Sequence, residues 1–300
     1  MRLSVTHETH YRYSSPVVLS QQLLHLTPRV LPWQRCEAHK ISVEPVAGET
    51  TEREDYYGNR TMSLVIAVPH EALVVRAAST VSVEARVRAA LAAPKAPWEA
   101  VRARLSVLDA PPLAEAVEFL FDSPHVERSA DLADYAVKSF TARRTILEAA
   151  TDLARRIHRD FRFDRTATSV STPLRQVLKQ KSGVCQDFAH LMIGCLRSIG
   201  LAARYVSGYI LTSPPPGRPR LVGADASHAW ASLYCGERAG WIDIDPTNNC
   251  IVDDAHVTLG WGRDFADVTP MRGVILGGGT QTLSVRVTVS PAVEATIESK

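Results

Sequence analysis

Long hydrophobic runs are missing from this chain of 300 residues. No stretch approaches the roughly 20 consecutive apolar residues that span a bilayer. The N-terminus, MRLSVTHETHYRYSS, alternates polar and apolar residues and lacks the apolar core of a secretory signal. An excess of one charge is missing too, because the net charge is only +2. These absences argue against a membrane protein, a membrane-surface binder or a nucleic-acid binder, and we expect a cytoplasmic location.

Paired cysteines are also missing. The cysteines are Cys36, Cys185, Cys195, Cys235 and Cys250, an odd number with no C-x-x-C spacing. This pattern excludes a typical disulfide framework and a zinc knuckle. No calcium loop of the D-x-[DN]-x-[DN]-G type occurs either. We therefore predict that the protein uses no metal and no cofactor.

The patterning that is present changes from β to α and back to β, which predicts an α+β protein of about two domains. RLSVTHETHYRY, SLVIAV and ALVVRAASTVSVEARV alternate or are β-branched, which is typical of an antiparallel sandwich. We expect the final strands to pair back onto this first domain. The predicted division is a β domain over 1–90, a helical connector over 91–145, a core over 146–265 and C-terminal strands over 266–300.

Two helices are predicted in the core. The first carries one apolar stripe from Ile146 to Phe161. The second starts near Cys185, has a stripe that includes Phe188 and Met192, and ends at Gly200. Strands ARYVSGYIL, SHAWASLYC and GWIDID follow, so we expect the second helix to pack on an antiparallel sheet.

Cys185 stands at the head of the second helix, directly after the segment SGV. The first N–H groups of a helix are unpaired and carry partial positive charge, so they stabilise a thiolate and can bind an oxyanion. The alternative for a single cysteine is a buried structural role. A histidine base nearby would favour the nucleophile.

A histidine and an acid are predicted to face each other across a hairpin. If Cys235 pairs with Gly240, Trp230 lies opposite Asp245, and His228 becomes its diagonal neighbour on the same face. A one-residue slip would break this arrangement. With the correct register, an aspartate orients a histidine that activates a cysteine.

These residues resemble the transglutaminase-like superfamily of papain-like thiol enzymes. The matching stretches are SGVCQDFAHLMIGCLRSIGLAARYVSGYI, SHAW and GWIDIDPTN, and the first eighty or so residues are similar to the β-rich N-terminal domain of bacterial members. The resemblance implies a papain-like core with Cys185 as nucleophile, His228 as base and Asp245 as the orienting acid. It also implies acyl chemistry on an amide bond.

Three functions stay open at this point. The first is a cysteine peptidase or amidase, in which water resolves a thioester. The second is a glutamine-dependent cross-linking transglutaminase, in which an amine resolves it. The third is a non-enzymatic scaffold on the same fold. We expect a peptide or protein substrate that offers an amide or glutamine side chain.

Several neighbouring residues were weighed for supporting roles. Gln180 and Trp230 are both candidates for the second oxyanion donor. Asp187, in the first turn of the helix, is expected to be structural because an acid is favourable there. His190 lies about 140° around the helix from Cys185, so we expect it to pack or to hydrogen-bond.

Overall fold

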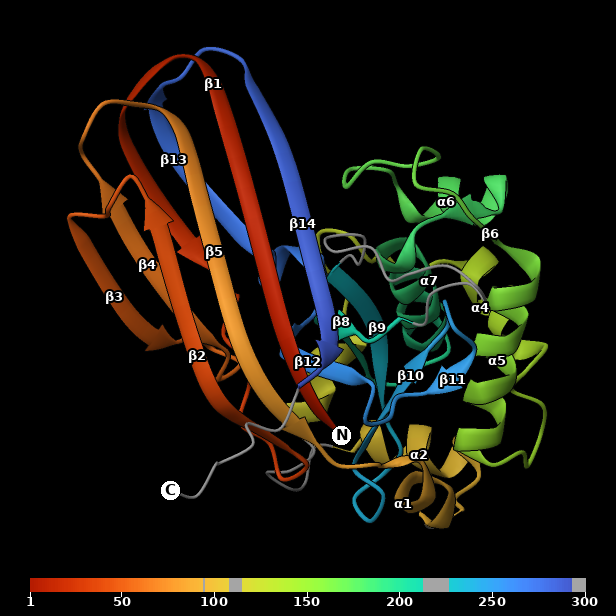
Figure 1. Ribbon diagram of the computed structural model, residues 1–300. Helices are drawn as coiled ribbons and strands as arrows, with labels where there is room; N and C mark the ends of the chain where they lie inside the picture. The colour runs from red at the N-terminus through yellow and green to blue at the C-terminus, as the bar shows by residue number, and fades with distance from the viewer. Residues whose placement is uncertain (94, 108–114, 213–226, 293–300) are drawn as a thin grey trace, which may run out of the picture.

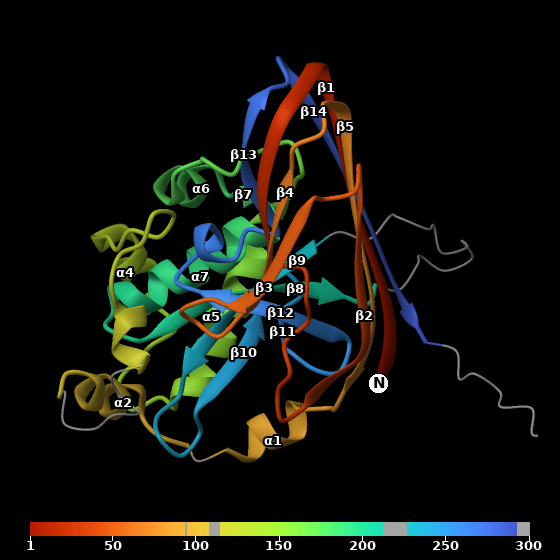
Figure 2. The ribbon, with the colours of Figure 1, turned by 90° about the vertical axis from the view of Figure 1, so that its left-hand side faces the viewer.

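The computed structural model describes residues 1–93, 95–107, 115–212 and 227–292. A curled antiparallel sheet stands beside a core of helices and a second sheet (Figure 1). Viewed from the side of the curled sheet, the helices lie behind it and to one side (Figure 2). The α+β prediction is therefore confirmed.

The curled sheet has the strand order β2-β5-β1-β4-β3, and two C-terminal strands complete it by pairing with β1. Strand β1 bends where its pairing with β5 stops at Arg12 and resumes at Val17. The predicted sandwich of two separate sheets is therefore wrong. The long strand β1 pairs with strands on both sides of its bend, so that all of them form one continuous sheet. The strands are β1 (Arg2–Leu24), β2 (Gln34–Glu44), β3 (Glu49–Glu54), β4 (Arg60–Ile66), β5 (His70–Val83), β13 (Met271–Gly277) and β14 (Gln281–Pro291).

The pairing of the C-terminal strands onto the first domain is observed as expected. Strand β14 pairs with the first half of β1, with Val287 opposite His7. Strand β13 pairs with the second half of β1. The first and last parts of the chain therefore form one sheet.

The second sheet is antiparallel with the order β11-β10-β9-β8-β12. The three strands predicted for the core are all present in it, as β8, β9 and β10. Strand β12, at the edge beside the curled sheet, was not predicted. The strands are β8 (Ala203–Ile210), β9 (Ser227–Tyr234), β10 (Trp241–Asp245), β11 (Cys250–Ile251) and β12 (His256–Gly262).

Helix α7 (Cys185–Ser198) is the central element of the core and packs on β9 and β8. The sequence predicted one apolar stripe, but every residue from Asp187 to Arg197 is buried. Other helices cover the faces that the sheet leaves free, so the helix is enclosed on all sides. The helices that pack against it are α4 (Ala130–Val137), α5 (Ile146–Asp160) and α6 (Leu174–Gln180). The remaining helices are α1 (Val87–Ala92) and α2 (Trp98–Leu105).

Shorter elements connect these layers. Strands β6 (Arg162–Phe163) and β7 (Ser182–Gly183) form a parallel pair just before α7. Single 3-10 turns, η1 (Glu118–Leu120) and η2 (Phe265–Asp267), lie in the connections. No helix among the described residues is long and apolar enough to cross a membrane.

Apolar contacts and buried amides join the two sheets. One hydrophobic cluster contains Val5 and Val287 of the curled sheet together with Val257 of β12. The Gln34 side chain accepts a hydrogen bond from Thr258 N at 2.7 Å and donates one to Thr258 O at 2.8 Å. The curled sheet thus holds the edge strand of the core directly.

Candidate active site

Cys185 is the first residue of α7, and a buried acid supports the start of this helix. Asp187 Oδ2 accepts hydrogen bonds from Val184 N at 2.8 Å and from Thr168 Oγ1 at 2.6 Å. Burial raises the pKa of Asp187. The structural role expected for Asp187 agrees with these contacts, which close the first turn and fix the position of the cysteine.

Gly183 is required at this turn for a steric reason. A Cβ atom at this position would lie 2.6 Å from Asp187 Oδ2 and 2.9 Å from Asp187 Cβ. Both distances are shorter than a van der Waals contact, so only glycine lets the capping carboxylate approach the chain.

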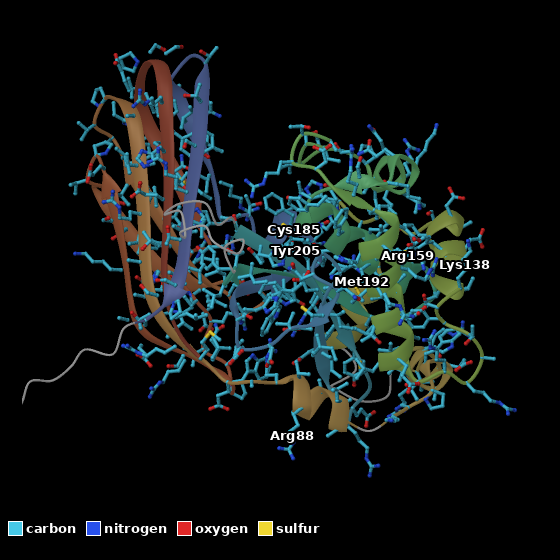
Figure 3. All side chains as sticks on the ribbon, turned by 45° about the vertical axis from the view of Figure 1, so that its right-hand side comes forward. Arg88, Lys138, Arg159, Cys185, Met192 and Tyr205 are labelled. Carbon is cyan, nitrogen blue, oxygen red and sulfur yellow. The ribbon has the colours of Figure 1, made fainter. Side chains whose placement is uncertain are left out.

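The Cys185 side chain is half-buried near the centre of the molecule, where the curled sheet and the core meet (Figure 3). Its Sγ lies 3.9 Å from the carbonyl oxygen of Ser227, at the start of β9. The next residue, His228, lies close enough to the cysteine for Cys185 to raise the pKa of its imidazole. Tyr205 also lies near the thiol, and burial together with the negative charge of Cys185 raises the pKa of its phenol.

His228 and Asp245 form a buried pair on β9 and β10. Their atoms Nε2 and Oδ2 are 2.7 Å apart, and the two side chains are 8% and 0% exposed. The predicted hairpin register is confirmed, because Cys235 N donates to Gly240 O and Ile244 pairs with Ala231. With Nε2 bound to the aspartate, Nδ1 is the ring nitrogen left for the Cys185 thiol.

The charges in this cluster favour a protonated histidine. Burial lowers the pKa of His228, but hydrogen bonds to Asp245 and Cys185 and their negative charges outweigh it and raise that pKa to about 10. Burial also acts to raise the pKa of Asp245, and hydrogen bonds from His228 and His256 instead hold it well below its ordinary value. The contacts thus support an imidazolium held by the Asp245 carboxylate.

Residues that the sequence analysis missed complete the surroundings of Asp245. The backbone N–H groups of Thr247 and Asn248 donate to Oδ1 at 2.8 and 3.1 Å. Asn248 Nδ2 donates to Oδ2 at 2.7 Å, and His256 Nε2 lies 3.3 Å from the same oxygen. Asn248 could have been found because it follows the acid in DPTN. His256 arrives from another strand and leaves no local signal.

The two candidates for the second oxyanion donor differ in their contacts. Gln180 Nε2 donates to the carbonyl oxygens of Ser182 at 3.0 Å and Ala167 at 3.4 Å, which uses both of its N–H groups. The Trp230 ring is fully buried and packs edge-on against His256 at 5.3 Å between centroids, and its Nε1 has no partner among the described residues. The backbone N–H of Cys185, at the head of the helix, is available as an oxyanion donor.

His228, Asp245 and His256 also offer three potential metal ligands within 4.8 Å of one another. Two ligands around a tetrahedral zinc ion lie about 3.4 Å apart when the bonds are about 2.1 Å. The 2.7 Å between His228 and Asp245 is shorter than this and is a hydrogen-bond distance. Asn248 Nδ2 already contacts both of these side chains. We therefore interpret the cluster as hydrogen-bonded side chains.

Other residues considered from the sequence have packing roles. His190 Nε2 accepts a hydrogen bond from Phe265 N at 3.1 Å, and burial lowers its pKa to about 3, so it remains neutral. Cys195 is buried in the core as expected. The guanidinium groups of Arg29 and Arg204 both lie over the Trp261 ring, with their Cζ atoms 3.5 and 3.9 Å from a ring centroid.

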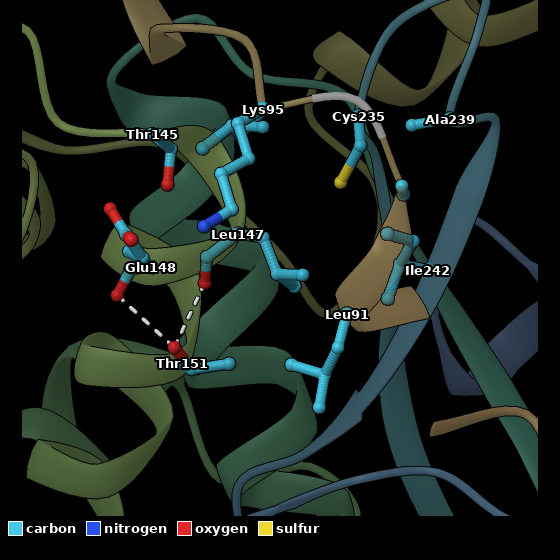
Figure 4. Close-up of a pocket in the computed structure, with 11 residues that line it drawn as sticks. Leu91, Lys95, Thr145, Leu147, Glu148, Thr151, Cys235, Ala239 and Ile242 are labelled. Carbon is cyan, nitrogen blue, oxygen red and sulfur yellow. Dashed lines mark hydrogen bonds between the residues drawn. The ribbon is translucent and has the colours of Figure 1, made fainter. Parts of the chain in front are cut away.

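Some of the sequence expectations concern residues away from the site. Asp225, just before SHAW, could line the site mouth by its position, but the sequence favours a solvated loop acid; it and the Pro-rich loop over 213–220 lie outside the described residues. Cys235 lines a cavity of about 130 Å³ between α1, α5 and the turn after β9 (Figure 4). Burial raises the pKa of its thiol to about 12. This thiol is therefore no rival to Cys185 as a nucleophile.

A cysteine at a helix head, facing a histidine–aspartate pair on an antiparallel sheet, is the arrangement of a papain-like thiol enzyme. Two family models match the chain, the bacterial transglutaminase-like N-terminal region over residues 3–82 and the transglutaminase-like superfamily over residues 132–246. The chain belongs to the transglutaminase-like superfamily, as its sequence indicated.

Similar proteins cover nearly the whole chain. An uncharacterized protein of Mycobacterium tuberculosis is 41% identical over 97% of this chain and 93% of its own length. A solved structure from Cytophaga hutchinsonii, proposed to be a cysteine protease, has a TM-score of 0.74 at 21% identity and covers 97% of this chain and 90% of that one. A short segment, 22% of this chain, is 38% identical to 10% of a protein-glutamine gamma-glutamyltransferase of Pseudomonas aeruginosa.

Proposed function

We propose that the protein is a thiol-dependent enzyme that acts on amide or peptide bonds, with Cys185 as nucleophile, His228 as acid and base, and Asp245 as the orienting acid. The observation that carries this proposal is the buried His228–Asp245 pair, held at 2.7 Å beside Cys185, whose Sγ lies 3.9 Å from the carbonyl oxygen of the residue before His228. Each of the three residues then has the partner that its role requires.

The reaction would run in two steps. The Cys185 thiolate attacks the carbonyl carbon, the C–N bond breaks, and the Nδ1 proton of His228 goes to the leaving nitrogen. A thioester on Cys185 results. Water or an amine then attacks the thioester, His228 takes up its proton, and the thiolate is released. Asp245 keeps the imidazole in the required tautomer and stabilises its cation throughout.

Hydrolysis is the function that we place first, so that the protein would be a cysteine peptidase or amidase. The absence of a calcium-loop motif in the sequence favours it over calcium-controlled cross-linking. The second candidate is transfer to an amine, which the similarity to a segment of a gamma-glutamyltransferase supports. The substrate would be a peptide or protein with an amide or glutamine side chain. The cytoplasmic location stays a prediction.

The first test is the pH dependence of alkylation by iodoacetamide between about pH 4 and about pH 9, located by peptide mass mapping. Cys185 should react fast below about pH 7, and His228→Ala should remove this reactivity. Cys36 serves as an internal reference, because it is half-buried and its thiol pKa is raised by burial. Equal reactivity of Cys185 and Cys36 would support the scaffold function instead.

The second test separates hydrolysis from transfer. A glutaminyl peptide is incubated with the enzyme, with and without a primary amine, and products are identified by mass. Free acid or cleaved peptide in both reactions supports hydrolysis, whereas an amine adduct supports transfer. Cys185→Ala should form neither product, because the thioester requires the thiol.

A further inference from the structure

The acid of the candidate triad is held by two imidazoles. His256, on the edge strand β12, is 4% exposed, and its Nε2 lies 3.3 Å from the same Asp245 oxygen that binds His228. The two histidine rings lie 6.1 Å apart between centroids. Because they reach Asp245 from different strands, they restrict the carboxylate from two directions.

Only one of these imidazoles has a partner for its second nitrogen. His228 Nε2 binds Asp245 at 2.7 Å, and the same imidazole interacts with Cys185. His256 Nδ1 is buried and has no partner among the residues that the structure describes. A cationic His256 would bury an unpaired N–H at Nδ1, which is costly. A proton on Nε2 alone satisfies the Asp245 contact and leaves no unpaired N–H at the buried Nδ1.

Side chains of the curled sheet fasten the strand that carries His256. Gln34 binds both backbone groups of Thr258, two residues along β12, and Asn59 Oδ1 accepts from Trp261 N at 2.9 Å. Asn59 Nδ2 donates to Trp261 O at 2.8 Å. These amides flank the irregular pairing between Thr258 and Gly260, where β12 loses its regular register with β8. A bulge in an edge strand disrupts the regular hydrogen bonds of the ladder, and these side-chain hydrogen bonds hold the strand in their place.

We propose that His256 is a positioning residue for the reaction, and that the N-terminal sheet acts on the active site through it. Gln34 and Asn59 hold β12, β12 presents His256 Nε2 to Asp245, and Asp245 is thereby fixed toward His228. This inference rests on the proposed function, because it assigns His256 a role in the Cys185–His228–Asp245 triad. It gives the N-terminal domain a part in catalysis beyond packing.

The proton on His256 is tested without any substrate by imidazole nitrogen NMR. We expect the neutral Nε2–H tautomer in the resting protein at neutral pH. The Nδ1–H tautomer would overturn the proposal, because Nε2 could not then donate to Asp245. The result does not depend on whether Cys185 is reactive, so it is distinguishable from failure of the proposed function.

The consequence for the triad is tested by the pH midpoint of Cys185 alkylation in two variants. His256→Gln keeps an N–H near the Nε2 position, and His256→Phe keeps a ring but removes the donor. We expect the midpoint to move to higher pH in His256→Phe, because a less constrained Asp245 stabilises the His228 cation less, and to return toward wild type in His256→Gln. His7→Gln is the control, since His7 is buried but binds Tyr209 and Thr9.

A shift in the pH midpoint of Cys185 alkylation arises from titratable groups near the triad, and those that face Asp245 come from three strands. They are His228 from β9, His256 from β12 and Cys250 from β11, and burial raises the pKa of Cys250 to about 11, so it stays neutral. A midpoint unchanged in His256→Phe, with only a lower melting temperature, would overturn the proposal. A midpoint moved to lower pH would also overturn it, because His256 would then only weaken Asp245 as an acceptor.

The link to the N-terminal sheet is tested by Gln34→Met, which keeps the shape but removes the bonds to Thr258. We expect the alkylation midpoint to move in the same direction as in His256→Phe. Gln22→Met is the matched control, because Gln22 is a buried glutamine of the same sheet that donates to Ser20 and does not contact β12 in these hydrogen bonds. Equal effects of the two variants would overturn the link.

Discussion

Asp245 is a charged side chain with no exposed surface, and the donors around it explain how it can be buried. Backbone N–H groups of Thr247 and Asn248 serve one oxygen, and three side chains serve the other. An unpaired buried carboxylate would instead take up a proton. The donors hold its pKa well below the ordinary value, so the charge persists at neutral pH and is available to His228.

Replacing Asp245 by asparagine should disconnect the histidine from its acid. The amide would still accept from Thr247 and Asn248, but an uncharged group no longer stabilises the His228 cation. We expect Cys185 alkylation at about pH 6 to fall by about tenfold or more. Asp243→Asn is the control, since Asp243 lies on the same strand but pairs with Arg86 at 3.2 Å. Equal loss in both variants would contradict the assignment of Asp245.

The raised pKa of His228 also predicts a pH dependence of stability. A folded-state pKa of about 10, above the unfolded value near 6.5, contributes stability that is fully present below about pH 6.5 and is lost as the pH rises through about 10. His228→Gln keeps a donor to Asp245 but cannot titrate. We expect the wild type to lose stability relative to this variant between about pH 7 and about pH 10, by an amount on the order of 3 kcal/mol.

Thermal unfolding of both proteins across this range measures the effect as a difference of melting temperatures. The comparison cancels the titration of the other groups, including His190, whose lowered pKa acts in the acid range. A difference that does not change with pH would show that His228 is not charged in the folded state.

At the scale of elements, the head of α7 depends on the close approach of two residues. Gly183→Ala would place a Cβ within 2.6 Å of Asp187 Oδ2 and displace the capping carboxylate. We expect a loss of about 1–3 kcal/mol in the free energy of unfolding, together with slower Cys185 alkylation. Gly48→Ala is the control, because its nearest neighbour would be Val65 O at 3.9 Å.

The outcome of this pair is read from melting temperatures and alkylation rates together. A Gly183→Ala protein as stable and as reactive as Gly48→Ala would show that the carboxylate can move without consequence. The cap would then not be what positions the cysteine.

Elements with local patterns could be predicted from the sequence, and those that depend on distant partners could not. The β9–β10 hairpin has alternating apolar and polar residues and a glycine turn, so its register and the facing of His228 and Asp245 followed. Strand β12 contains two glycines and is held by side chains from residues 34 and 59. Its local sequence did not lead to the prediction of a strand, so the position of His256 beside Asp245 was not predicted either.

The environment of α7 shows a second limit. Its apolar stripe predicted one packed face, whereas its polar side chains are buried as well. Arg197, only 1% exposed, donates to the carbonyl oxygens of Ala203, Phe121 and Arg263. Two of the carbonyl oxygens that pair with the buried guanidinium, those of Phe121 and Arg263, come from distant parts of the chain. Hydropathy alone therefore assigns Arg197 to the surface. The pairing partners of an enclosed helix appear only in the folded structure.

At the scale of the whole molecule, the two ends of the chain are tied together over the junction of the two sheets. Strand β14 pairs with β1 along its length, from Leu3 opposite Pro291 to Tyr13 opposite Gln281. The C-terminal half of β14 contributes to the hydrophobic cluster that includes Val257 of β12. The N-terminal half of β14 is exposed. The strand therefore has one half that joins the sheets and one half that does not.

This difference within one strand gives a prediction for the molecule as a whole. Val287, 1% exposed, lies in the cluster shared with β12, and Leu283, on the same face of β14, is 56% exposed. Val287→Asp buries an unpaired carboxylate between the sheets and should destabilise the protein by about 3 kcal/mol or more. Leu283→Asp should change the free energy of unfolding by less than about 0.5 kcal/mol.

If the junction also supports the active site, the Val287→Asp protein that remains folded should react more slowly at Cys185 than the Leu283→Asp protein. The comparison is made well below the melting temperature of both proteins, with folded fractions confirmed by circular dichroism. Slower reaction is expected because a loosened junction frees β12, and with it the contact between His256 and Asp245. Full reactivity in a destabilised but folded Val287→Asp protein would mean that the sheets are joined for stability alone, and that the core holds its triad without help from the N-terminal sheet.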